Sequence, residues 1–177
     1  MIAYIGFGCR LLLAVVFLVA AAGKLFRRRN LTEFRSSLAA FGVRPRWRPA
    51  VTAGVVGGEL AAAALLPVEV TALAGLAIGA ALLIAFTSAI AVALRRGTPA
   101  DCRCFGGSAR PLGLRHLVRN AILLSIAACG TAGTVLATNP GAAGWDAVAL
   151  LLSGFVALFL AAMLIAYDDL VSLVLPR

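Results

Sequence analysis

Five stretches of apolar residues, separated by short polar segments, dominate the hydrophobic pattern of the chain. They cover residues 2–26, 50–66, 71–94, 117–137 and 147–167. A helix needs about 20 apolar residues to cross the ~30 Å hydrocarbon core of a bilayer, and the stretches approach or exceed that length. They are too long and too continuous for membrane barrel strands, which alternate apolar and polar residues over about 10 positions. The pattern predicts an all-α integral membrane helical bundle with about five transmembrane helices in a single domain, residues 1–177.

Composition supports a membrane protein and argues against a nucleic-acid binder. The chain is 62% hydrophobic with a mean hydropathy of +1.01, whereas soluble domains are about 45–50% apolar. A chain of 177 residues has too small an interior to hide this excess from water. The formal net charge is +9, but the basic residues lie in loops between apolar stretches. Anionic lipid headgroups are therefore the expected partners of these charges.

The distribution of charge between the stretches predicts how they are oriented. Lysine and arginine concentrate in residues 24–48 and 95–119. In the links around residues 67–69 and 139–146, by contrast, the only charged residues are acidic. Basic loops remain on the cytoplasmic side of a membrane. We therefore expect the N-terminus outside, both basic loops in the cytoplasm and the C-terminus inside.

The first basic loop contains an amphipathic pattern. Leu31, Phe34, Leu38 and Phe41 recur at helical spacing, and Thr32 is placed to cap the helix. This predicts a short helix on the inner membrane surface. One interpretation is a docking surface or a lid, and another is a connector anchored to lipid.

Two charged residues, Arg10 and Glu59, fall inside the apolar stretches. A charge at the centre of a bilayer costs several kcal/mol, so such residues usually pair or line a cavity. If Lys24 and Pro49 both lie near the inner surface, Arg10 is ~21 Å and Glu59 ~15 Å from that surface. We predict an Arg10–Glu59 ion pair between the first two helices. An alternative is that the pair lines a pocket for a quinone headgroup or tunes a nearby thiol.

Cys102 and Cys104 lie close together in the polar loop at residues 95–116. A disulfide between cysteines two positions apart closes a small, strained ring that is easily reduced. Arg103 between them, with further arginines nearby, favours the thiolate and lowers the thiol pKa. Three interpretations are open: redox chemistry, capture of a soft metal such as Cu(I) or Hg(II), and an inert pair. Asp101 orients the loop, exchanges protons or serves as a turn residue.

The remaining cysteines and the single histidine give weaker signals. Cys9 and Cys129 lie within apolar stretches, ~22 Å and ~18 Å from the inner surface. They form a second dithiol only if the first and fourth helices are neighbours, and otherwise they pack as small apolar residues. His116 is interpreted as an interfacial residue at the start of the fourth helix.

These residues resemble the MauE family of the DoxX-like membrane group. The opening helix, residues 10–25, is similar to that group's first helix, and Glu59 matches an acid in its second. The signature Cys-x-Cys-Phe-Gly is present as Cys102, Arg103, Cys104, Phe105 and Gly106. The resemblance implies a multi-pass protein of a bacterial cytoplasmic membrane. It also implies a role in disulfide formation or reduction, with a thioredoxin-like partner.

Three hypotheses of function follow. The favoured one is a membrane thiol–disulfide oxidoreductase or electron conduit that uses Cys102 and Cys104, with a quinone as the only cofactor considered. The second is a soft-metal transporter or metallochaperone subunit, and the third is a non-catalytic membrane scaffold. The spacing of Gly75 and Gly79 predicts close helix packing and leaves oligomerisation open.

Overall fold

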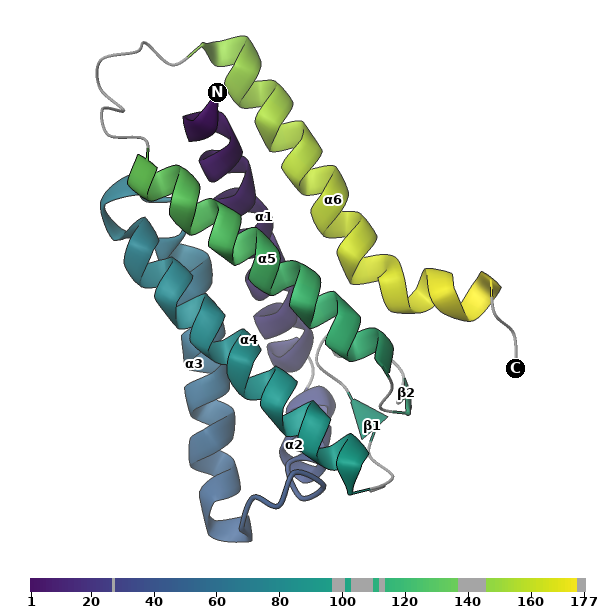
Figure 1. Ribbon diagram of the computed structural model, residues 1–177. Helices are drawn as coiled ribbons and strands as arrows, with labels where there is room; N and C mark the ends of the chain where they lie inside the picture. The colour runs from purple at the N-terminus through teal and green to yellow at the C-terminus, as the bar shows by residue number, and fades with distance from the viewer. Residues whose placement is uncertain (27, 97–100, 103–109, 112–113, 137–145, 175–177) are drawn as a thin grey trace.

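A computed structural model describes residues 1–26, 28–96, 101–102, 110–111, 114–136 and 146–174 of the protein. These residues form a bundle of long helices with one short strand pair at one end (Figure 1). The elements in chain order are α1 (Ile2–Leu25), α2 (Arg28–Ser37), η1 (Pro45–Trp47), α3 (Arg48–Leu65), η2 (Glu69–Thr71), α4 (Ala72–Arg95), β1 (Asp101–Cys102), β2 (Arg110–Pro111), α5 (Leu114–Leu136) and α6 (Ala147–Val174).

Four of these helices, within the described residues, are long and apolar enough to cross a membrane: α1, α4, α5 and α6. The second predicted span corresponds to α3, which has 18 residues. It contains the charged residues Arg48 and Glu59 and is not among the four helices that meet the length and composition of a membrane span. The prediction of an all-α membrane bundle is confirmed, and the chain is a multi-pass membrane protein.

The bundle is organised around α1. This helix packs against α3, α5 and α6, while α4 packs against α3 and α5. Figure 1 shows α1 passing behind α5, with α6 on one side and α3 and α4 on the other. Leu13 and Phe17 of α1 are buried in the shared core. By contrast, α6 exposes most of its large apolar side chains, such as Leu151 and Phe155, as expected for a helix that faces lipid.

α1 and α5 approach each other closely at two glycines. A Cβ atom on Gly133 would lie 2.7 Å from the Cα of Gly6, and one on Gly6 would lie 3.0 Å from the carbonyl carbon of Gly133. Both distances are to backbone atoms, which cannot move aside as a flexible side chain can. Small residues of this kind allow membrane helices to pack backbone against backbone.

We expect Gly133→Ala to destabilise the protein by about 1–3 kcal/mol, because the added methyl group forces α1 and α5 apart. The measurement is thermal unfolding of the purified protein in one detergent. The matched control is Gly54→Ala, since a Cβ at Gly54 meets nothing within 4 Å. Equal loss in both variants would contradict the close contact between α1 and α5.

The predicted amphipathic segment forms α2, which covers one end of the bundle. We call this the α2 end: α2, the last turns of α1 and α4, and the starts of α3 and α5 (Figure 1). Phe34 and Leu38 are buried, and α2 packs against α1 and α3. The apolar face therefore covers protein. Thr32 is not a cap, because its hydroxyl donates to the carbonyl oxygen of Arg29 at 2.8 Å inside the helix.

Candidate functional site

A buried ion pair joins α1 to α3 near the α2 end. Nζ of Lys24 donates to Oε1 of Glu59 at 2.7 Å, and the two side chains are 1% and 2% exposed. The same ammonium donates to the carbonyl oxygen of Ala20 at 3.2 Å and lies 5.2 Å from the ring centroid of Phe34. A charge this deeply buried needs such partners, because its hydration is lost.

The predicted Arg10–Glu59 ion pair is wrong. Side chains on a helix tilt toward its N-terminus. Lys24 therefore reaches back along α1, as its bond to Ala20 shows, and meets Glu59, which tilts toward the start of the antiparallel α3. Arg10 also tilts toward the start of α1, and because it lies much nearer that end than Glu59 does, its side chain points away from Glu59. Arg10 is buried, and its Nε has no hydrogen-bond partner among the described residues.

Glu59 also lines a small cavity between the helices. Oε2 is buried and has no hydrogen-bond partner within the described part of the chain. Glu59 lines a cavity of about 30 Å³, which has room for about two water molecules. Lys24 holds Oε1 and does not line this space, so Oε2 is the oxygen left to face it.

Polar side chains from α5 complete the wall of this cavity. His116, Arg119 and Asn120 line it, and all three are buried. Nδ2 of Asn120 donates to the hydroxyl oxygen of Thr87 on α4 at 3.3 Å. We call this space the polar cavity. Its other lining residues are apolar: Val16, Phe17, Ala20, Leu83, Phe86, Ile90 and Leu123.

The sequence analysis missed the polar cavity and interpreted His116 as interfacial. The side chain of His116 is only 4% exposed and lies inside the bundle. A signal was present in the sequence: residues 116, 119, 120 and 123 are spaced as one face of a helix. That face begins polar and continues apolar, which is consistent with a buried stripe that ends in a polar site.

The backbone places Cys102 opposite an arginine. β1 and β2 pair antiparallel, with Asp101 opposite Pro111 and Cys102 opposite Arg110. Opposed Cα atoms in such a pair lie about 4.5–5.5 Å apart. α5 begins at Leu114, shortly after β2, so the strand pair lies at the α2 end near the start of α5 (Figure 1). The predicted site residues Arg103, Cys104, Phe105 and Gly106 lie outside the described residues.

Cys9 and Cys129 lie on neighbouring helices, as a second dithiol requires. α1 and α5 pack together, and a Cβ on Gly130, next to Cys129, would lie 3.3 Å from the Cβ of Cys9. Both thiols are free in the structure. Their pairing as a second dithiol stays a prediction.

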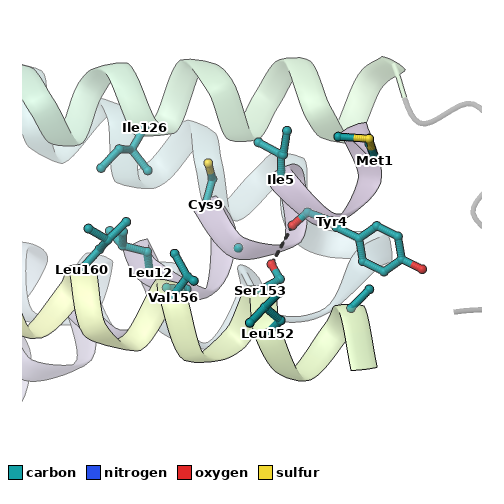
Figure 2. A pocket seen from close by; sticks show the side chains of 13 residues that line it. Met1, Tyr4, Ile5, Cys9, Leu12, Ile126, Leu152, Ser153, Val156 and Leu160 are labelled. Carbon is teal, nitrogen blue, oxygen red and sulfur yellow. Dashed lines mark hydrogen bonds between the residues drawn. The ribbon is translucent and has the colours of Figure 1, made fainter. Parts of the chain in front are cut away.

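An apolar groove of about 480 Å³ runs between α1, α5 and α6 (Figure 2). Cys9, Leu12, Ile126 and Val156 are among its lining residues. The hydroxyl of Ser153 lies at this groove but donates to the backbone oxygen of Tyr4 at 2.9 Å. The described lining contains no charged side chain. Arg10 and Glu59, which the quinone prediction placed in a pocket, are not among the described residues that line this groove, and quinone binding stays a prediction.

Potential metal ligands do not gather within the described part of the chain. No three His, Cys, Asp or Glu side chains there are close enough together to hold a metal ion. The soft-metal hypothesis therefore depends on Cys102 and Cys104 alone, and Cys104 is not among the described residues.

A family model and a curated relative both match this chain to the same family. Residues 2–133 match the family described as methylamine utilisation protein MauE. The curated methylamine utilization protein MauE of Paracoccus denitrificans is 36% identical over 142 residues, which is 76% of this chain and 75% of that protein. No solved structure matches the chain significantly. The family match includes both members of the buried ion pair, the Cys-x-Cys loop and the lining of the polar cavity, and it ends before α6.

Proposed function

Because the chain belongs to the MauE family, we propose that it is a membrane thiol–disulfide oxidoreductase or electron conduit. In this proposal Cys102 and Cys104 cycle between dithiol and disulfide and exchange electrons with a thioredoxin-like partner. The protein acts in a bacterial cytoplasmic membrane, in the methylamine-utilisation context that the name of its relative carries.

The observation that supports this function best is the register of the strand pair. The backbone of Cys102 lies directly opposite that of Arg110. A neighbouring cation favours the thiolate, which is the nucleophile of disulfide exchange. The pairing also brings residues 101–102 and 110–111 together shortly before the start of α5.

The chemistry follows from two adjacent thiols. The thiolate of one cysteine attacks a sulfur of the partner's disulfide, so that a mixed disulfide forms and a partner thiolate leaves. The second loop cysteine loses its proton and attacks the mixed disulfide. The loop is then oxidised by two electrons and the partner is reduced to a dithiol. Run in reverse, the same steps reduce the loop disulfide.

The test is the redox state of each cysteine in the purified full-length protein in lipid nanodiscs. The protein is equilibrated with thioredoxin at defined ratios of oxidised to reduced forms, and free thiols are alkylated and located by peptide mass spectrometry. We expect Cys102 and Cys104 to become protected together as the ratio rises. If both remain alkylated at every ratio, the oxidoreductase proposal is wrong. Stoichiometric Cu(I) binding without oxidation would support the metal transporter instead.

A further inference from the structure

Glu59 is a carboxylate with two different surroundings for its two oxygens. Oε1 is held by the ammonium of Lys24 at 2.7 Å. Oε2 is buried and has no hydrogen-bond partner among the described residues, and Glu59 lines the polar cavity. An unmade hydrogen bond to a buried charged oxygen is costly. A cavity that is polar and large enough for water supplies the missing partner.

The groups around Glu59 surround it with positive or ionisable side chains. Lys24 faces it from α1, and His116 and Arg119 line the same cavity from α5. The polar groups from α4 and α5 at this level, Thr87 and Asn120, are neutral. Glu59 is thus the only carboxylate among the described residues that line the polar cavity. Ionisable side chains that face a cavity inside a membrane bundle often belong to proton relays.

We propose that Glu59 and the hydrated polar cavity form a proton-exchange site that takes up the proton released when a loop thiol becomes a thiolate. This inference rests on the proposed function and adds to it the group that receives the proton. Cavity water carries protons between Oε2 and the α2 end, where the strand pair holds Cys102 and α5 begins. Glu59 acts through water and is a proton-exchange group, not a nucleophile.

The proton and electron balance is as follows. The S–H bond of a loop cysteine breaks, its electron pair stays on sulfur, and the proton passes through water to Oε2 of Glu59. The thiolate then attacks the partner disulfide, and a partner thiolate leaves. The proton returns from Glu59 to that thiolate before the second loop cysteine reacts. Two protons and two electrons pass from the loop to the partner, and Glu59 holds one proton at a time.

The experiment is infrared difference spectroscopy of the full-length protein in nanodiscs. A protonated carboxyl group gives a carbonyl band that shifts in D2O, and a carboxylate does not. In the reduced protein, before a partner is added, the proposal places one loop cysteine as the thiolate and its proton on Glu59. We therefore expect this band in the reduced protein and not in the oxidised protein. The band should be absent in Glu59→Gln. It should also be absent in Lys24→Met/Glu59→Gln, in which both charges of the pair are removed and no unpaired ammonium remains. It should remain in Glu69→Gln, the same change at an exposed acid in the link between α3 and α4.

A second arm tests Glu59 without the redox step. In Cys102→Ser/Cys104→Ser, the Glu59 band should still increase as the pH falls, and His116→Gln should shift that titration, because His116 lines the same cavity. If no band titrates, the proton-exchange site is refuted. If the dithiol cycles by alkylation but the band does not respond to it, this inference is overturned and the proposed function stands. If the band titrates but the dithiol never cycles, the proposed function fails, and with it the assignment of the thiol as the source of the proton.

Discussion

Replacing Cys102 or Cys104 with serine is expected to reduce disulfide exchange to the background of the variant that lacks both. A serine hydroxyl is not ionised near neutral pH and cannot form a disulfide, so either change removes one of the two required thiolates. The measurement is the rate at which the full-length protein in nanodiscs reduces oxidised thioredoxin. Each single variant should show no exchange above that of Cys102→Ser/Cys104→Ser.

The two single variants should also differ from each other. In the variant that retains only the attacking cysteine, the mixed disulfide with thioredoxin forms but cannot be resolved. That variant should accumulate a covalent complex on a non-reducing gel, and the other should not. If either single variant exchanges disulfides at the parent rate, the Cys-x-Cys loop does not carry out the exchange. Retained exchange with loss of Hg(II) binding would instead favour the soft-metal hypothesis.

The helices of the bundle were predictable because their signal is strong and local. Long runs of apolar residues indicate helices that are exposed to lipid. A run such as residues 71–94 is too long for a membrane strand, so a helix is the expected structure. The amphipathic spacing of Leu31 and Phe34 was likewise sufficient to predict α2. The sequence did not show what the apolar face of α2 covers. An amphipathic helix has the same sequence pattern whether its apolar face covers lipid or protein. Only the contacts of α2 with α1 and α3 show that it covers protein here.

The buried ion pair was predicted with the right acid and the wrong base. Helix depth alone left Arg10 within reach of Glu59, and Lys24 was assigned to the membrane surface. The direction of the side chains decides between the two, because Lys24 and Glu59 tilt toward each other and Arg10 tilts away. The polar cavity was harder to predict, because it requires α1, α3, α4 and α5 to meet. No single stretch of sequence contains that information.

Removing one member of the Lys24–Glu59 pair should destabilise the protein far more than removing both. Lys24→Met leaves a buried carboxylate, and Glu59→Gln leaves a buried ammonium, with side chains that are 1% and 2% exposed in the parent. Each single change is expected to cost about 3–5 kcal/mol, because an unpaired charge stays away from water. Lys24→Met/Glu59→Gln should recover most of that loss, since it contains neither charge and nearly the same volume.

The measurement is a double-mutant cycle of unfolding free energy for the purified protein in one detergent. The exposed pair on α2 provides the control: Nε of Arg29 lies 2.8 Å from Oε1 of Glu33, and Arg29 is 82% exposed. Water and salt screen such a pair, so Arg29→Gln should leave stability unchanged. If the double variant at Lys24 and Glu59 loses as much as the two single variants together, the pair is not energetically coupled. The association of α1 with α3 would then depend on apolar packing. The position of Glu59 beside the polar cavity would not depend on the ammonium of Lys24 that now binds Oε1.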